Sequence, residues 1–155
     1  MSPRLTQCDP MQDKSPAMTS TIRTYSELRA YQTFEDRYKY LRLRGEVGSQ
    51  TFGFDRYINQ QFYTSREWRQ IRHRVILRDE GCDLGVPGYE IFDKVIIHHM
   101  NPMVADDIVY GEESILDPEY LITVSFRTHN AIHYGDERLL PRPWTPRKPG
   151  DTRLW

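Results

Sequence analysis

Apolar side chains recur along this 155-residue chain with two different periods. Between residues 26 and 44 they are spaced three and four apart, which predicts an amphipathic helix. The same spacing returns over residues 64–80, where Trp68 and Val75 share the apolar face and Gly81 follows the last turn. A threonine followed three residues later by a glutamate stands at the start of each segment, and such a pair caps a helix N-terminus.

Extended segments lie in the second half of the chain. Residues 94–99 and 121–125 are short runs rich in β-branched side chains, which is typical of strands. Residues 128–134 predict a short helix that Gly135 ends. Two strands and several helices that are not in strict alternation predict an α+β fold.

The remaining segments carry weaker patterns. Residues 46–63 hold five aromatic residues and predict a connector whose rings cover the core, whereas residues 83–93 are rich in turn formers. Residues 101–119 predict a loop with six acidic residues and no basic one. Four parts are therefore expected: a disordered segment 1–22, a helical and aromatic extension 23–63, the main domain 64–137, and an extended, basic, proline-rich tail 138–155.

Composition limits the possible partners. The formal net charge is -1, so a nucleic acid would have to be bound by a local basic patch rather than by a global field. Cys8 and Cys82 are too few and too far apart for a disulfide framework, which favours a reducing compartment. No apolar run approaches the length of a membrane span, and residues 1–22 contain no apolar core of a secretory signal. We expect a protein of the host cell's cytoplasm that has no membrane partner.

A local basic patch exists on the predicted helix 64–80. Five arginines and one glutamate fall between residues 64 and 78. Guanidinium groups on one helix face suit contacts with backbone phosphates, and a solvated charged face is an equally good interpretation of this pattern taken alone. The candidate DNA contacts are Arg66, Arg69, Arg72 and Arg74.

Four of the five histidines gather in two short stretches. His129 and His133 are one helical turn apart, so both imidazoles lie on one side of the predicted helix. His98 and His99 are adjacent on a strand and must point to opposite sides or splay at its end. At most one of this pair can join the helix histidines on a metal ion, which leaves the other free as a base.

This set suits the hydrolysis of a phosphodiester. The reaction needs a water molecule to be deprotonated and the developing negative charge to be offset. Neutral imidazoles can hold a divalent metal for the second task, and an imidazole that is not a ligand can perform the first. The chain lacks the His-Glu-x-x-His pattern of zincins and has too few cysteines for a structural zinc site built on them.

Residues 63–137 resemble HNH endonucleases of the ββα-metal superfamily, in particular the small HNH proteins of tailed bacteriophages. The resemblance rests on Ser65-Arg66-Glu67-Trp68-Arg69, on the run from Ile97 to Pro102, on residues 117–125 and on His129-Asn130-Ala131-Ile132-His133. It implies a core of a two-stranded hairpin and a helix, flanked by N-terminal helices and the extended tail.

The resemblance also implies roles for single residues. His98 and His129 would ligate one divalent ion (Mg, Mn, Ni or Zn), and His99 would be the general base. His133 would be a further ligand or a phosphate contact. An asparagine that usually braces the loop holding the base is replaced by Tyr120, whose phenol can hydrogen-bond in its place.

A second departure concerns a structural zinc that many relatives hold with two Cys-x-x-Cys pairs. Here the four matching positions are Cys82, Gly85, Ser125 and Thr128, so only one of four ligands remains and no structural zinc is expected. Core packing must then hold this corner of the fold together.

The resulting hypothesis is a metal-dependent DNA endonuclease that nicks or breaks DNA in a bacterial host cell. For phage relatives, the resemblance implies a role beside the terminase subunits in genome packaging. Two alternatives remain: a catalytically weak DNA- or terminase-binding accessory protein that keeps the metal fold, and a structural metalloprotein that binds no nucleic acid.

Overall fold

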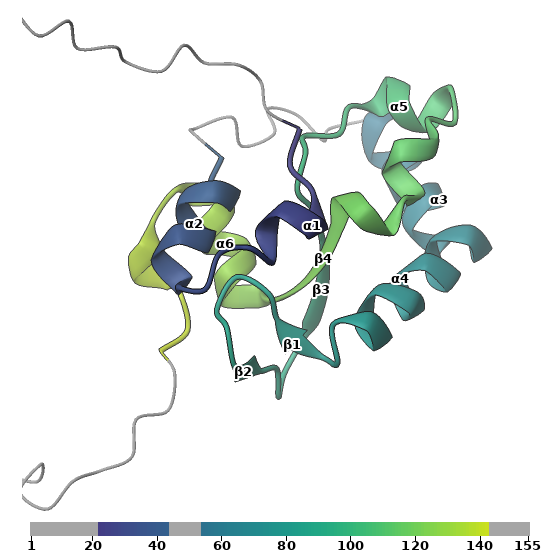
Figure 1. Cartoon of the computed structure of the whole chain (residues 1–155). Coiled ribbons are helices and arrows are strands. Elements are labelled where there is room, and N and C mark those ends of the chain that lie inside the picture. Colours follow the sequence, from purple (N-terminus) through teal and green to yellow (C-terminus); the bar gives the residue numbers. More distant parts are fainter. Residues whose placement is uncertain (1–21, 44–53, 143–155) are drawn as a thin grey trace, which may run out of the picture.

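A computed structural model of the chain describes residues 22–43 and 54–142. The expected disorder before residue 22 and most of the predicted tail lie outside these residues. The described helices and strands are α1 Tyr25–Leu28, α2 Phe34–Leu41, α3 Phe54–Thr64, α4 Arg66–Arg78, β1 Cys82–Asp83, β2 Tyr89–Glu90, β3 Val95–His99, α5 Ala105–Val109, β4 Leu121–Ser125 and α6 Phe126–Tyr134, with 3-10 turns η1 Glu113–Leu116, η2 Pro118–Tyr120 and η3 Glu137–Leu139 (Figure 1).

The α+β class is confirmed. Two small antiparallel sheets, β1 with β2 and β3 with β4, are surrounded by helices. In the central sheet Val95 is paired with Ser125 and His99 with Leu121, so all five residues of each strand are paired. None of the described helices combines the length and the apolar character that crossing a membrane requires.

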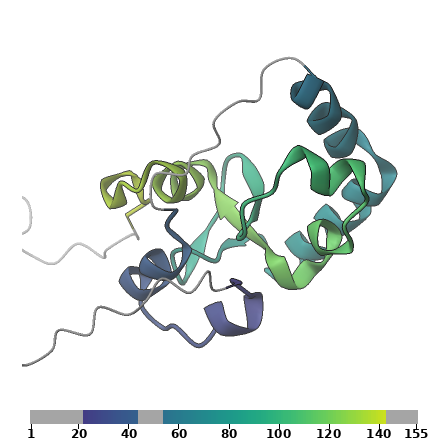
Figure 2. The same cartoon turned by 90° about the horizontal axis from the view of Figure 1, so that it is seen from above.

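The central sheet separates two apolar clusters. Helices α3 and α4 lie on one side of it, and α2 and α6 lie on the other (Figures 1 and 2). Ile97 and Leu121 pack in the cluster that contains Trp68 and Val75 of α4. The alternate residues Ile96, Ile122 and Val124 pack in the other cluster, with Ile132 of α6 and Leu28, Leu41, Leu43 and Met100. This division follows from the period of two in a strand.

Two predicted elements differ from the structure: one predicted helix is broken into two, and one predicted connector is partly helical. The continuous helix expected over 26–44 is broken into α1 and α2, because Thr33 is extended and its side chain caps a new helix at the backbone N–H of Asp36. The connector expected over 46–63 contains α3, in which Ile58 and Phe62, four residues apart, bury one face.

The loop expected over 101–119 is also partly helical. It contains α5 and the turns η1 and η2. The Asp107 carboxylate accepts the backbone N–H of Val104 at 2.8 Å and thereby closes the first turn of α5. One of the acidic residues of the predicted loop thus stabilises local helical structure.

The corner formed by Cys82, Gly85, Ser125 and Thr128 is built around a buried carboxylate. Asp83 is 1% exposed and accepts the backbone N–H groups of Gly85 at 2.9 Å and Ser125 at 3.0 Å. The Thr128 hydroxyl donates to the same carboxylate and lies 3.2 Å from the Ser125 hydroxyl. Hydrogen bonds to Asp83 therefore join β1 to β4 and α6 at this corner.

A second buried carboxylate stands beside the first. Asp79 accepts the backbone N–H of Thr123 at 2.8 Å and pairs with the Arg78 guanidinium at 2.7 Å. The same guanidinium donates to the backbone carbonyls of Pro118 and Leu121 at 2.6 and 2.7 Å. The end of α4 is thereby fixed to the start of β4.

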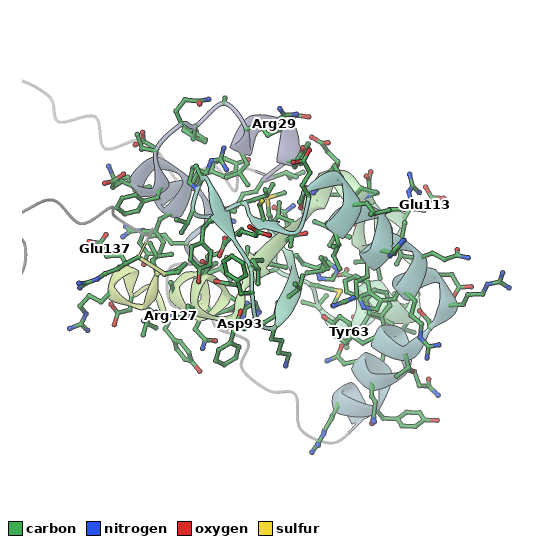
Figure 3. All side chains as sticks on the ribbon, turned by 90° about the horizontal axis from the view of Figure 1, so that it is seen from below. Arg29, Tyr63, Asp93, Glu113, Arg127 and Glu137 are labelled. Atoms are coloured by element: carbon green, nitrogen blue, oxygen red, sulfur yellow. The ribbon has the colours of Figure 1, made fainter. Side chains whose placement is uncertain are left out.

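We predict that Asp83→Ala lowers the free energy of unfolding by about 3 kcal/mol or more, because two backbone N–H groups and a hydroxyl lose a charged acceptor in the core. Asp93→Ala, at an exposed carboxylate (Figure 3), should change it by less than about 0.5 kcal/mol. Urea denaturation followed by circular dichroism measures both. Equal stability of the two variants would contradict a structural role for Asp83.

Candidate metal centre

Three histidines converge on the face of the sheet that α6 covers. His98 comes from β3, and His129 and His133 are one turn apart on α6. The helix begins at residue 126 because the Ser125 hydroxyl caps the N–H of Thr128, and it ends at Gly135, whose φ of 64° is the left-handed conformation that glycine adopts without strain. The two caps fix where the helix histidines stand relative to β3.

The three rings lie close enough to share one ion. Each residue offers one ring nitrogen such that these atoms all lie within 4.8 Å of one another. Ring centroids are separated by 5.5 Å for His98–His129, 5.1 Å for His98–His133 and 4.3 Å for His129–His133. Zinc is held by imidazole nitrogen at about 2.1 Å, so small side-chain rotations complete a three-nitrogen site.

Burial keeps these histidines neutral. The side chain of His98 is 2% exposed. Desolvation and the neighbouring histidines hold the pKa of His98 well below its ordinary value, and burial followed by repulsion from His133 lowers the pKa of His129 to about 4. Burial also lowers the pKa of His133. Neutral imidazole is the form that binds metal, so the set is ready to bind at neutral pH.

Two ring nitrogens of this group are buried without a partner. Nε2 of His98 and Nδ1 of His129 have no hydrogen-bond partner among the described residues. A buried polar atom left unpaired costs free energy, and a metal ion is a partner that both nitrogens can share. The residues present therefore fit a divalent transition metal, with three imidazoles as its ligands among the described residues.

His99 lies on the other face of the sheet, as the alternation of a strand predicts. Its ring is stacked on Trp68 with centroids 5.3 Å apart and planes at 15°. Its Nε2–H donates to the backbone carbonyl of Ile115 at 3.0 Å, which leaves Nδ1 as the nitrogen with the lone pair. Burial lowers the pKa of His99, so this ring is also neutral at pH 7.

His99 borders a cavity of about 380 Å³. Tyr120 lines the same cavity, and its phenol has no hydrogen-bond partner among residues 22–43 and 54–142. Its backbone carbonyl instead accepts the N–H of Met100 at 3.0 Å. In this structure His99 is held by the Ile115 carbonyl and Trp68, and the phenol of Tyr120 makes no such contact.

The four candidate DNA-contacting arginines are exposed on α4. Arg66, Arg69 and Arg74 border a shallow surface groove, and Arg72 donates to the backbone carbonyl of Val95 at 3.3 Å. The central sheet stands between α4 and α6 (Figures 1 and 2), so the arginine face and the three metal-site histidines are on opposite sides of it.

Sequence reasoning missed several groups at the site. Trp68 was assigned to the core by its helical period, and it does pack there while also stacking on His99. The carbonyl of Ile115 carries no signal in the sequence, because any residue supplies one. Asn101 lies two residues after His99, and its carboxamide forms hydrogen bonds with the backbone N–H and the backbone carbonyl of Arg23.

No protein-family model, curated protein or solved structure matches this chain. Its function is therefore inferred from the residues and their geometry.

We predict that Ni²⁺ or Zn²⁺ stabilises the protein against unfolding. At a free concentration one hundred times the dissociation constant the gain is about 2.7 kcal/mol. His98→Ala removes the buried ligand and should abolish most of this gain, whereas His73→Ala, at an exposed histidine on α4, should keep it. Thermal unfolding with and without EDTA measures the effect, and an equal gain in both variants would exclude the histidine site.

Proposed function

We propose that this protein is a metal-dependent endonuclease that hydrolyses DNA phosphodiester bonds, with an HNH core formed by β3, β4 and α6. One observation carries the proposal. Three neutral histidines converge, two of them with an unpartnered buried nitrogen, and a fourth, His99, follows the buried ligand His98 on the same strand. A metal site and a neutral imidazole that is not a ligand, provided by adjacent residues of β3, are the two groups that phosphodiester hydrolysis requires.

In this proposal His98, His129 and His133 hold one divalent ion. The bound ion supplies positive charge that offsets the charge developing on the phosphate and on the leaving 3′ oxygen. His99 is the general base, and its Nδ1 takes the proton of the attacking water. The Ile115 carbonyl accepts a hydrogen bond from Nε2–H and thereby stabilises the imidazolium that forms. Trp68 restricts rotation of the ring.

The arginine face of α4 is the proposed contact for the DNA backbone. Arg66, Arg69 and Arg74 are exposed around one groove and can bind phosphates without reading sequence. Because the sheet separates this face from the metal centre, a bound duplex would have to cross the end of the sheet to touch both. Low sequence specificity is expected from such contacts.

The biological setting is proposed from the resemblance to phage HNH proteins alone. The protein would act in the cytoplasm of a bacterial host, with terminase subunits as partners in genome packaging. A catalytically weak accessory protein is the competing proposal, and the unbonded phenol of Tyr120 favours it, because that side chain replaces the usual brace of the catalytic loop.

We predict that the wild-type protein nicks plasmid DNA with at least one of Mg²⁺, Mn²⁺, Ni²⁺ and Zn²⁺. His99→Ala should lower the rate about 100-fold or more because the general base is lost. Lys39→Ala, at an exposed lysine of α2, should leave the rate unchanged. Gel analysis of nicked and linear plasmid measures the rates. A His99→Ala rate equal to that of wild type excludes the base, and no cutting with any metal supports the accessory protein.

We also predict that Arg69→Ala and Arg74→Ala weaken binding to duplex DNA by similar factors for unrelated sequences. Each lost phosphate contact should reduce the slope of log affinity against log salt concentration by about one. Lys39→Ala, at a lysine that is 73% exposed on α2, is the control and should keep the slope. Fluorescence anisotropy at several salt concentrations provides the measurement. A sequence-dependent loss would contradict phosphate contact.

A further inference from the structure

Arg23 enters the candidate site from the N-terminal extension. It precedes α1 and is 75 residues before His98, yet it borders the same cavity as His99 and Tyr120. Its backbone N–H donates to the side-chain oxygen of Asn101 at 2.7 Å, and its carbonyl accepts from the Asn101 amide nitrogen at 3.0 Å. Both polar atoms of the Asn101 side chain are thus used to fix one residue.

The side chain of Arg23 is also held in place. Its Nε–H donates to the backbone carbonyl of Tyr40 at 2.7 Å, and Nη2 donates to that of Arg42 at 3.4 Å. Both acceptors are neutral, so the charge of the guanidinium is not compensated by them. Within residues 22–43 and 54–142 no carboxylate forms an ion pair with Arg23.

The guanidinium therefore keeps unused binding capacity. Of its five N–H groups, two are bonded to the carbonyls, and the other three have no partner among the described residues. The side chain is half-buried rather than fully solvated, so its orientation is set before any ligand arrives. A fixed guanidinium with free N–H groups matches the oxygens of a phosphate.

The free N–H groups of Arg23 are not occupied by the acidic side chains of the cavity. Two carboxylates, Asp107 and Glu112, also line the cavity, and Asp107 is already bonded to the N–H of Val104. Neither carboxylate forms a hydrogen bond or an ion pair with Arg23, so three N–H groups of its guanidinium have no partner among the described residues.

We infer that Arg23 binds a phosphate of the DNA strand next to His99, so that the N-terminal extension supplies part of the substrate site. This inference rests on the proposed nuclease function and assigns to the extension a role besides packing. Asn101 is the positioning residue that holds Arg23. Because Asn101 lies two residues after His99, it links the end of β3 to the arginine that contacts the phosphate.

The test measures binding of duplex DNA in EDTA, where cleavage does not interfere. Arg23→Gln keeps a hydrogen-bond donor but removes the charge, and should lower affinity about tenfold and reduce the salt slope by about one. Arg23→Lys keeps the charge and should retain the slope. Arg29→Gln, at an exposed arginine of the same extension (Figure 3), should behave as wild type.

An unchanged slope for Arg23→Gln would overturn the inference and leave the nuclease proposal intact. Equal losses for the Gln and Lys variants would also overturn it, because charge would then not be the cause. If wild type binds no duplex at low salt, the nuclease proposal fails together with this subsite.

A measurement on the wild-type protein covers the case in which Arg23→Gln does not fold. Phenylglyoxal modifies accessible arginines, and mass spectrometry locates the modified positions. Saturating DNA should protect Arg23 severalfold while Arg29 stays reactive. Equal modification of Arg23 with and without DNA would contradict phosphate binding.

Discussion

The arrangement of the site depends on how strand β4 satisfies its backbone. One edge of β4 pairs with β3, and no described strand is paired with the other edge, where the N–H of Leu84 donates to the carbonyl of Thr123 at 2.9 Å. The N–H groups of Thr123 and Ser125 on that second edge are bonded to the buried carboxylates of Asp79 and Asp83. Unpaired backbone groups in a core are costly, so these two carboxylates allow strand β4 to be fully buried. All five residues of β4 are buried as a result.

Because β4 is buried and fixed, the adjacent histidines of its partner strand β3 lie in separate surroundings. The side chain of His98 meets α6, and that of His99 meets α4, although their backbones are neighbours. A shift of the strand register by one residue would exchange the two rings. The carboxylates that hold β4 therefore also determine which imidazole stands with the metal-site histidines and which one stands against Trp68.

The sequence predicted the parts of the fold that depend on local pattern. Strands β3 and β4 appeared as β-branched runs, α4 as an apolar run at helical spacing and α6 as a short helix ended by Gly135, although Ser65 rather than Thr64 caps α4 and Ser125 caps α6. The opposite directions of His98 and His99 followed from strand geometry. The break between α1 and α2 was missed because the apolar period continues through it. The contacts of His99 with Ile115 and of Asn101 with Arg23 join residues 16 and 78 positions apart, and no local pattern contains such pairs.

Gly85 restricts the routes by which this chain can change. A Cβ atom at this position would lie 2.5 Å from Cγ2 of Thr128, closer than folded proteins tolerate. Any larger residue at 85, including a cysteine that would form a pair with Cys82, first requires a smaller or differently oriented side chain at 128. The two positions are therefore epistatic: the change at 128 must come before the change at 85.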